Sequence, residues 1–325
     1  MLRLPTFTAH FPRTIDDAVG LKAQSPGSAY VAGGTDLYPN MKRRQQTPAV
    51  VIDVRGIPEL GRLDVGPDGT LRIVAGVTLP RLIRDPVVRD GWSALAGAAA
   101  TISTPLLQNM GTVGGNLLLD TRCNYYNQTF EWRQAIDFCM KKDGAICWVA
   151  PSSPRCWAVQ SSDLVPLMVA LGAQVTLTGP RGTRALPAGA LYRDDGMEFL
   201  TKEPDELLVR VDVPPLAGAR AIYEKLRRRG SFDFPVLGVA AWMRLDGTGV
   251  VQEARIVLGA VGSYPKVCPE AATALQGRRL DDNALDAAAH LAARIGKPLD
   301  NTDFTISWRK DLIPVFVRRA LAGLR

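Results

Sequence analysis

Four of the five cysteines in this 325-residue chain lie within one segment, at Cys123, Cys139, Cys147 and Cys156. They are separated by 15, 7 and 8 residues, and the segment is rich in aromatic, basic and amide side chains without a helix or strand period. Four thiolates can bind a [4Fe–4S] cluster, one to each iron, and a long loop can bring them together without regular spacing. The segment therefore predicts a loop that folds around a metal centre.

Other arrangements of these cysteines stay open. Disulfides require an oxidising compartment, and no feature of the sequence places the chain in one. Structural zinc sites usually contain C-x2–4-C pairs, which the segment lacks. The third arrangement is core cysteines without a ligand, but a polar loop offers little core in which to bury them. The fifth cysteine, Cys268, stands alone in YPKVCPE, which favours a packing or surface thiol over a ligand. Among these arrangements the sequence favours the iron–sulfur cluster.

Two glycine pairs form a second candidate site. In AYVAGGTDL, residues 29–37, a short apolar strand is expected to run into Gly33–Gly34. The second pair stands in MGTVGGNLLL, residues 110–119. Paired glycines allow positive φ and can turn successive N–H groups inward, which suits a phosphate group. Neither pair matches the G-x-G-x-x-G or P-loop pattern, but two such turns together predict a site for both phosphates of a dinucleotide.

The flanking elements are expected to place these motifs on an α/β scaffold. TIDDAVGLKAQ has helical apolar spacing, and Thr14 is a candidate cap for that helix. ELLVRVDV is predicted to be a strand that stops at Pro214–Pro215, a candidate domain boundary. Beyond it we expect strands at GVAAWMRL and EARIVLGAV, and helices over 281–295 and 308–322, with Asp281 among the cap candidates.

Composition narrows the class of protein. A chain with 46% hydrophobic and 22% charged residues is ordinary for a soluble globular protein. The apolar runs fall short of a bilayer span and the N-terminus shows no secretory signal, so a cytoplasmic protein without a membrane partner is expected. The net charge is +7, but the basic residues are scattered and no nucleic-acid motif surrounds Arg227–Arg229. No nucleic-acid partner is expected.

Three motifs, AGGTDL, GTVGGNL and SSDLVPLMVALGAQV, resemble those of the FAD-binding subunits of molybdenum hydroxylases, a family that includes xanthine dehydrogenase and carbon monoxide dehydrogenase. The similarity covers almost the whole chain. It implies an α+β or α/β fold with FAD-binding lobes at residues 1–57 and 58–215. It also implies a C-terminal domain at residues 216–325, with a three-stranded antiparallel sheet and helices. The cysteine segment is then an insertion in the second lobe, at about residues 120–160.

The resemblance also implies roles for named residues. The two glycine loops of the family hold FAD, and no catalytic residue is implied on this chain. The implied FAD contacts are Tyr30, Val31, Ala32, Gly33, Gly34, Thr35, Asp36, Leu37, Ile102, Thr112, Val113, Gly114, Gly115, Asn116, Asp163, Leu208 and Lys225. Asp163 is expected to accept hydrogen bonds from hydroxyl groups of the FAD, and Leu208 and Lys225 to lie near its isoalloxazine ring.

The cysteine segment, with DTRC and YNQ, closely resembles the β subunits of 4-hydroxybenzoyl-CoA reductases, in which the inserted loop binds a [4Fe–4S] cluster. A periplasmic aldehyde oxidoreductase also has a cysteine-bearing loop at this place, with different spacing. The resemblance implies a cytoplasmic heterohexamer, a dimer of heterotrimers, with a large molybdenum-cofactor subunit and a small [2Fe–2S] subunit. Electrons would pass from ferredoxin through this chain to molybdenum. The reaction implied is the anaerobic reductive dehydroxylation of 4-hydroxybenzoyl-CoA to benzoyl-CoA.

Three other functions stay open. One is an oxidising hydroxylase subunit for an aldehyde or N-heterocycle. Another is a self-contained flavin oxidase, although the only histidines, His10 and His290, stand far along the chain from both glycine loops and form no acid–base group. The third is a zinc-stabilised flavin-binding scaffold without redox function.

Basic residues accompany the cysteines. They are either solvated surface charge or a set that offsets the negative charge of a cluster and attracts an acidic ferredoxin. These residues are Arg122, Arg133, Lys141, Lys142 and Arg155.

Overall fold

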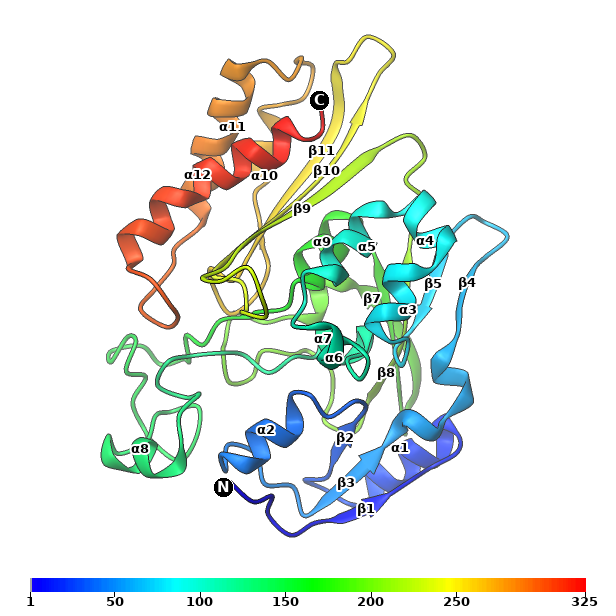
Figure 1. Ribbon diagram of the computed structural model, residues 1–325, viewed down its shortest axis with the longest axis vertical. Helices are drawn as coiled ribbons and strands as arrows, with labels where there is room; N and C mark the ends of the chain where they lie inside the picture. Colours follow the sequence, from blue (N-terminus) through cyan, green and yellow to red (C-terminus); the bar gives the residue numbers. More distant parts are fainter. Residues whose placement is uncertain (1) are drawn as a thin grey trace.

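The computed structural model describes residues 2–325 and builds them around three β-sheets that follow one another along the long axis of the molecule (Figure 1). The N-terminal sheet lies at one end, the C-terminal sheet at the other, and the largest sheet lies between them. The expected fold class, a mixed α/β protein with a C-terminal antiparallel sheet, is confirmed.

The first sheet is parallel and contains, in spatial order, β1 (Thr8–His10), β3 (Val50–Asp53) and β2 (Ala29–Val31). Helix α1 (Ile15–Gln24) links β1 to β2, and Thr14 caps it as predicted: its Oγ1 accepts a hydrogen bond of 3.1 Å from the Asp17 N–H. The chain leaves β2 through the first glycine pair and enters α2 (Leu37–Lys42).

The second sheet is antiparallel. Its strands in spatial order are β4 (Leu63–Val65), β5 (Leu71–Val74), β8 (Leu207–Val213), β6 (Gln174–Gly179) and β7 (Gly182–Pro187). The helices of this part of the chain are α3 (Leu79–Arg84), α4 (Pro86–Gly91), α5 (Ser93–Ala100), α6 (Pro105–Gln108), α7 (Val113–Leu117) and α9 (Leu164–Ala170), with short 3-10 turns at Val54–Gly56, Pro58–Gly61 and Ala188–Leu191.

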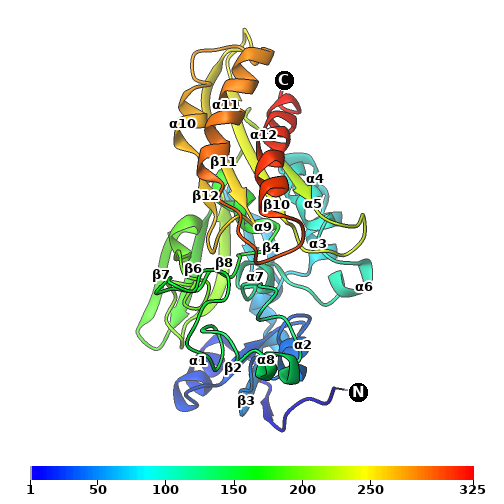
Figure 2. The same ribbon diagram turned by 90° about the vertical axis from the view of Figure 1, so that its left-hand side faces the viewer.

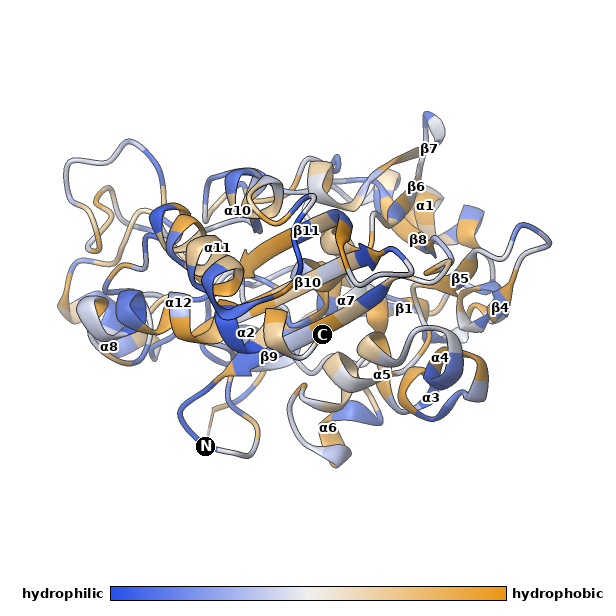
Figure 3. Cartoon of the chain, turned by 90° about the horizontal axis from the view of Figure 1, so that it is seen from above, coloured by the Kyte–Doolittle hydropathy of each residue, from blue (hydrophilic) through white to orange (hydrophobic). Residues whose placement is uncertain are grey.

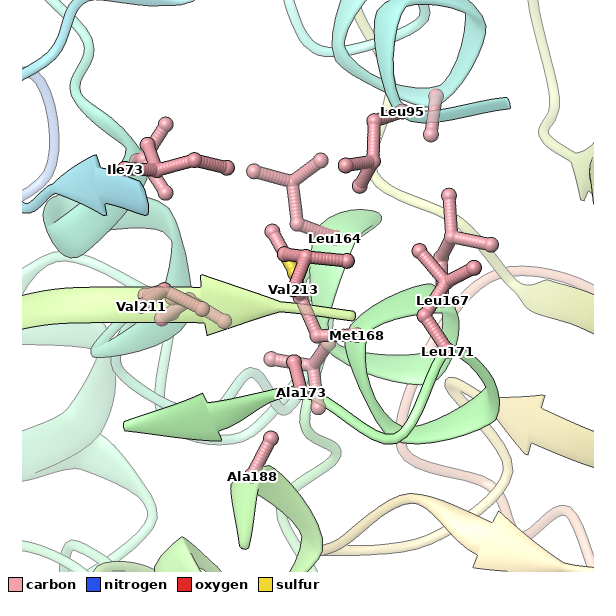
Figure 4. Close-up of a cluster of buried hydrophobic side chains, with 14 of the residues drawn as sticks. Ile73, Leu95, Leu164, Leu167, Met168, Leu171, Ala173, Ala188, Val211 and Val213 are labelled. Carbon is pink, nitrogen blue, oxygen red and sulfur yellow. The ribbon is translucent and has the colours of Figure 1, made fainter. Parts of the chain in front are cut away.

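Helix α9 is the centre of the main hydrophobic core. Leu164, Leu167 and Met168 are fully buried there. Figure 4 shows them between the β8 residues Val211 and Val213 and side chains of the surrounding elements. Because α9 begins directly after Asp163, this core fixes the position of a predicted site residue.

The cysteine segment is the irregular part of the fold. Between α7 and α9 its one helix is α8 (Phe130–Ala135), within the described chain, which agrees with the absence of a period in the sequence. Figure 2 shows α8 near α2, and the Arg133 side chain donates a hydrogen bond of 2.9 Å to the carbonyl of Arg43, just after α2. The segment therefore packs against the N-terminal lobe.

The C-terminal sheet is antiparallel and contains β9 (Arg220–Leu226), β10 (Leu237–Leu245), β11 (Val251–Gly259) and the short β12 (Lys266–Val267). The implied three strands are therefore present, with a two-residue fourth strand at the edge. Three helices follow: α10 (Pro269–Thr273), α11 (Asp282–Ile295) and α12 (Ile306–Ala322). Asp281 caps α11 as predicted, whereas α12 begins before residue 308 because Thr305 caps it.

Strand β10 joins the C-terminal domain to the middle one. It is buried on both faces: Ala240 and Trp242 face the core around α9, while Val239 and Ala241 face α11 and α12. This explains its continuous apolar sequence, since a strand with one solvated face would alternate. Figure 3 shows α11 and α12 beside the hydrophobic residues of β10 and β11. The domain limits at 57 and 215 remain predictions.

Within the described chain, none of the helices combines the length and the apolar character that a transmembrane span requires.

Candidate functional site

A cavity of about 500 Å³ lies where the three parts of the chain meet. This volume is within the range of small-molecule and cofactor sites, which is roughly 300–1,000 Å³. Fifteen of the predicted FAD-contacting residues line it: Tyr30, Val31, Ala32, Gly33, Gly34, Thr35, Asp36, Leu37, Ile102, Thr112, Gly114, Gly115, Asn116, Asp163 and Leu208. The structure thus brings the two glycine motifs, separated in sequence, to one cavity.

The first glycine pair has no room for side chains. Gly34 has φ of +71°, and a Cβ there would lie 2.3 Å from the Tyr38 ring. A Cβ on Gly33 would lie 1.7 Å from the carbonyl oxygen of Met110, which belongs to the second motif. Glycine is therefore required here both for the left-handed backbone and for the close approach of the two loops.

The second glycine pair differs from the expectation. Gly114 and Gly115 do not form a positive-φ turn; they lie in the first turn of α7, where the Gly115 N–H donates a hydrogen bond of 3.0 Å to Thr112 Oγ1. The prediction of a left-handed nest is therefore wrong at this position, because the Thr112 cap starts a helix instead. A Cβ on Gly114 would lie 2.7 Å from the Ala75 Cβ, so close packing against the loop after β5 requires this glycine.

Asn116 and Asp163 connect the second motif to α9. Asn116 Oδ1 accepts hydrogen bonds from Ser162 Oγ at 2.6 Å and from the Leu164 N–H at 3.3 Å. Asp163 lines the cavity, but both of its carboxylate oxygens are engaged: Oδ1 accepts from the Tyr223 hydroxyl at 2.8 Å, and Oδ2 from Lys225 Nζ at 2.9 Å. These contacts make Asp163 a fixed part of the cavity wall.

The Asp163–Lys225 pair is almost completely buried. Burial raises the pKa of Asp163 and lowers the pKa of Lys225, and in each case the charge of the partner opposes the effect of burial. Lys225 also donates to the carbonyl of Thr101 at 3.0 Å, so its ammonium group is held behind Asp163. Neither Lys225 nor Val113 is among the residues that line the cavity, and the Val113 side chain is packed in the core.

A link between the cavity and the cysteine segment was not predicted. The Arg122 guanidinium donates to the Asp36 carboxylate of the first glycine motif and lies over the Phe234 ring, 4.4 Å from its centroid. Burial raises the pKa of Asp36, and Arg122 opposes this shift. The Asp120 N–H also donates to Asp36, at 3.4 Å. Asp120, Arg122 and Phe234 all line the cavity, so the start of the cysteine segment is part of its wall.

The four cysteines lie together in the fold. All are buried free thiols, and Cys123, Cys139 and Cys156 pack in one cluster with Tyr126 and Ala158. The neighbouring Cys156 thiol lowers the pKa of Cys147 to about 5, and Cys147 raises the pKa of Cys156. Burial raises the pKa of Cys123 to about 12.

The backbone around these thiols follows one pattern. A backbone N–H from the residue two positions further on lies near each sulfur and lowers the pKa of its thiol, and at three of the four the N–H three positions further on does the same. The Ala158 N–H donates a hydrogen bond of 3.4 Å to Cys156 Sγ. The N–H groups of Tyr126, Lys142 and Ala150 donate to the carbonyls of Cys123, Cys139 and Cys147. Such N–H donors stabilise thiolates and tune the potential of iron–sulfur clusters.

Among residues 2–325, no group of three or more histidine, cysteine, aspartate or glutamate side chains is arranged to hold a single metal ion. A cubane cluster takes one thiolate at each iron, so its ligands surround a larger object than one ion.

The basic residues of the segment are mostly engaged with acids of the same chain. The buried ammonium of Lys141 donates to Asp120 at 2.8 Å, to Thr121 Oγ1 at 2.6 Å and to the carbonyl of Gly196 at 2.7 Å. Arg155 pairs with Asp194 at 2.8 Å. The interpretation of these residues as freely solvated charge is therefore wrong for Lys141 and Arg155, since tertiary contacts absent from the sequence pattern hold them.

Asn301, from the loop before α12, holds both ends of the cysteine segment. Its carbonyl accepts from the Asn124 N–H at 3.0 Å, and its side-chain amide donates to the carbonyl of Trp157 at 2.6 Å. Asn124 and Trp157 directly follow Cys123 and Cys156. The buried Arg309 holds this loop in turn, donating to the carbonyl of Leu299 at 2.8 Å. The C-terminal domain is thus part of the support of the cysteine site.

The remaining cysteine and the histidines lie elsewhere. Cys268 is fully buried in the hydrophobic core of the C-terminal domain, where burial raises its pKa to about 12. His290 is on the exposed side of α11, and neither it nor His10 lines the cavity.

Known protein families match this architecture over nearly its full length. Residues 5–216 match the family described as the FAD binding domain in molybdopterin dehydrogenase, and residues 221–324 match the CO dehydrogenase flavoprotein C-terminal domain. The aldehyde oxidoreductase FAD-binding subunit PaoB of Escherichia coli K12 is 33% identical, with 89% of this chain and 92% of that protein covered. The carbon monoxide dehydrogenase medium chain of Afipia carboxidovorans is 30% identical, with 97% and 96% covered.

Solved structures show the same likeness in three dimensions. A Cu,Mo-CO dehydrogenase in its cyanide-inactivated form superimposes with a TM-score of 0.82 at 28% identity, covering 99% of this chain and 98% of that one. Quinoline 2-oxidoreductase from Pseudomonas putida 86 has a TM-score of 0.80 at 23% identity, which shows the shared fold alone.

Proposed function

Because this chain belongs to the family of FAD-binding medium subunits of molybdenum hydroxylases, we propose that it is the electron-transfer subunit of such a complex and that it carries a [4Fe–4S] cluster beside its FAD. The supporting observation is the group of four buried thiols with N–H donors, joined to the cavity by the residues that precede Cys123. Electron carriers must lie close together. The residues before Cys123 line the cavity, which supports a short distance between a cluster on the four cysteines and FAD in the cavity.

The cavity suits FAD for reasons visible in its walls. The missing side chains at Gly33, Gly34 and Gly114 leave room for backbone to approach a phosphate, and Thr35 and Thr112 offer hydroxyl groups there. Leu208 and Phe234 supply apolar surface for a flat ring system. FAD, when bound, would supply a carrier that can take up and pass on electrons one at a time. The residues of this chain bind and orient it.

The four cysteines suit an iron–sulfur cluster better than a structural zinc site or disulfides. Cys123, Cys139, Cys147 and Cys156 supply four sulfur ligands, and backbone N–H groups are available to share their negative charge. The segment also contains a buried cation, Arg133, with two guanidinium nitrogens that have no hydrogen-bond partner in the described structure, and an anionic centre would complement it. In this proposal the segment is a dedicated entry or exit point for electrons.

For the whole complex we propose the reductive dehydroxylation of 4-hydroxybenzoyl-CoA, on the strength of the cysteine spacing and the DTRC and YNQ motifs. This chain would relay electrons from a ferredoxin toward a small [2Fe–2S] subunit and a large molybdenum-cofactor subunit, in a dimer of heterotrimers. Both a CoA thioester and a ferredoxin are reactants of the cytoplasm, and we place the complex there. Contrary to the charge-based expectation, Lys141 and Arg155 already have acidic partners and are not available to attract ferredoxin.

A second candidate function is favoured by the relative named above. The 33% identity to an aldehyde oxidoreductase subunit supports a complex that oxidises an aldehyde, with electrons leaving through this chain. Activity assays of the purified three-subunit complex distinguish the two candidate functions. We expect benzoyl-CoA to form from 4-hydroxybenzoyl-CoA when a reduced viologen dye is supplied. Oxidation of aromatic aldehydes with an oxidised dye, and no turnover of the thioester, would replace the first function with the second.

Cofactor analysis tests the proposal for this chain itself. Anaerobically purified protein should contain one FAD and about four iron and four acid-labile sulfide atoms per chain. Zinc without iron or sulfide would instead support the zinc-stabilised scaffold, and protein that binds no FAD would contradict the assignment of the cavity.

A further inference from the structure

Arg133, on α8, is a fully buried arginine whose guanidinium group is only partly satisfied. Its Nη2 donates to the carbonyl of Arg43 at 2.9 Å. Its Nε and Nη1 are buried and have no hydrogen-bond partner within residues 2–325. The guanidinium lies near the rings of Phe130 and Phe138, 5.9 and 5.8 Å from their centroids. A buried cation with unsatisfied donors is strongly unfavourable unless a negative charge lies close to it.

Within the described residues, the one acid that pairs with Arg133 makes a long contact and is partly exposed to solvent. Asp143 is the nearest carboxylate in the described structure, with Oδ2 at 3.9 Å from Arg133 Nη1, too far for a hydrogen bond. The Asp143 side chain is 40% exposed and pairs with Lys142 at 3.1 Å. The other buried cations of the segment contrast with Arg133, since Arg122 contacts Asp36 and Lys141 contacts Asp120.

The position of Arg133 points to the thiols. The carbonyl of Arg133 accepts a hydrogen bond of 2.7 Å from the Phe138 N–H, so the end of α8 is tied to the residue that precedes Cys139. The guanidinium of Arg133 also lies 5.8 Å from the centroid of the ring of Phe138, which directly precedes Cys139. Both contacts place this buried cation inside the cysteine segment, beside the backbone that carries Cys139.

We propose that Arg133 is the buried counter-charge of the metal centre that Cys123, Cys139, Cys147 and Cys156 hold. This inference rests on the proposed function, in which the four thiolates and their cluster carry a net negative charge that increases on reduction. Arg133 then has two effects. It stabilises the loaded segment, and it favours the reduced cluster, so it raises the reduction potential. In the metal-free protein the same residue is a buried charge opposed only by the long contact with Asp143, and it destabilises the segment.

Arg133 is therefore expected to stabilise the loaded chain and to destabilise the metal-free chain. Thermal unfolding of the full-length chain, with and without its metal centre, tests both effects. We expect Arg133→Met to raise the melting temperature of the metal-free chain and to lower that of the loaded chain. Arg155→Met is the matched control. Its guanidinium has Asp194 as a partner and lies over the Trp157 ring, so its loss should lower both melting temperatures. Arg133→Lys, which keeps the charge, should follow the wild type more closely than the Met variant does.

A redox titration followed by electron paramagnetic resonance adds an independent readout. The cluster of Arg133→Met should have a more negative midpoint potential than the wild type, and Arg133→Lys should restore most of the difference. Equal potentials in all three proteins, or a metal-free Met variant no more stable than the metal-free wild type, would overturn the inference. If Arg133→Met cannot be loaded with the metal centre, the melting temperatures of the metal-free variant and the metal-free wild type still test the inference. Wild-type protein that contains no iron or sulfide would contradict the proposed cluster itself. That result differs from a protein that contains iron but whose midpoint potential and melting temperature do not change when Arg133 is replaced, which would contradict only the role of Arg133.

Discussion

The guanidinium of Arg122 pairs with the carboxylate of Asp36, which connects the residue before the first cysteine to the first glycine loop. Both side chains line the cavity and are mostly buried. The cysteine segment and the cavity therefore share a wall, and a change in one is expected to affect the other.

Arg122→Gln should weaken FAD binding. The variant leaves Asp36 partly buried without its cation, so the first glycine loop loses a contact worth about 2 kcal/mol, or roughly 30-fold in Kd. Fluorescence titration of FAD into the flavin-free chain measures this. Arg193→Gln, at an exposed residue with only a long contact to Glu198, is the control and should bind FAD as the wild type does. Adding Asp36→Asn should recover part of the loss, and a Kd unchanged in Arg122→Gln would show that the two sites are independent.

Gly34→Ala should release FAD. The new methyl group would lie against the Tyr38 ring at a positive φ, and the loop would have to move away from the cavity. Gly27→Ala separates the two effects, because Gly27 also has a positive φ of +80° but has open space around its Cβ position. Both variants should lose about 1 kcal/mol of unfolding free energy from backbone strain. Only Gly34→Ala should lose its flavin absorbance, and a flavin-bound Gly34→Ala would show that this turn is structural.

Replacing any one of Cys123, Cys139, Cys147 and Cys156 with Ser should remove most of the iron. The serine keeps the size of the side chain but is a poor ligand for a cluster. FAD should largely remain in all four variants, because none of the four cysteines lines the cavity. Electron transfer from ferredoxin to the complex should then be lost, while a small dye that reaches the flavin should still reduce it.

Cys268→Ser is the control for that series. Cys268 lies in the C-terminal core, so its variant should keep iron, FAD and electron transfer, with at most a small loss of stability. Loss of the cluster in Cys268→Ser, together with iron retained in one of the other four variants, would show that the ligand assignment is wrong.

Lys225→Met should destabilise the protein by about 3–5 kcal/mol at neutral pH, because it leaves the Asp163 charge buried with only the Tyr223 hydroxyl as a partner. Burial already raises the pKa of Asp163, and loss of Lys225 raises it further. The folded variant then binds a proton more tightly than the unfolded chain does. Its stability should therefore fall as pH rises above about 4, the pKa of Asp in an unfolded chain.

Urea unfolding of wild type and Lys225→Met at pH 4 and pH 7 measures this effect. The deficit of the variant should be smaller at pH 4, where Asp163 is protonated. Lys310→Met, at an exposed residue of α12, should show no such pH dependence. A deficit that is equal at both pH values would show that Asp163 is neutral in the wild type as well.

The sequence was most informative where local physical chemistry determines structure. Thr14 and Asp281 cap helices as predicted, and Gly34 has the positive φ expected of it, because caps and tight turns depend on neighbouring residues. Gly115 shows the limit of this reasoning. A glycine pair after a threonine is compatible with either a turn or a capped helix. In the structure the pair is helical and Gly114 packs against Ala75, a tertiary contact that the local sequence does not reveal.

The pairing of charges was not accessible from the sequence. Asp194 and Asp120 hold Arg155 and Lys141 through tertiary contacts, and no local pattern predicts such partners. Tyr223 could have been found: it is two residues from Lys225 on β9, so both side chains are on the same face of the strand and both reach Asp163.

The Asn301 contacts have a consequence for biogenesis. A chain leaves the ribosome from its N-terminus, and its domains generally fold in that order. Asn301 lies 144 residues beyond Trp157, so the carbonyl next to Cys156 lacks its partner until almost the entire chain has been synthesised. The cysteine segment is therefore completed last, although it lies near the middle of the chain. Iron and sulfide are expected to be delivered after translation, to a released polypeptide whose C-terminal domain has already folded.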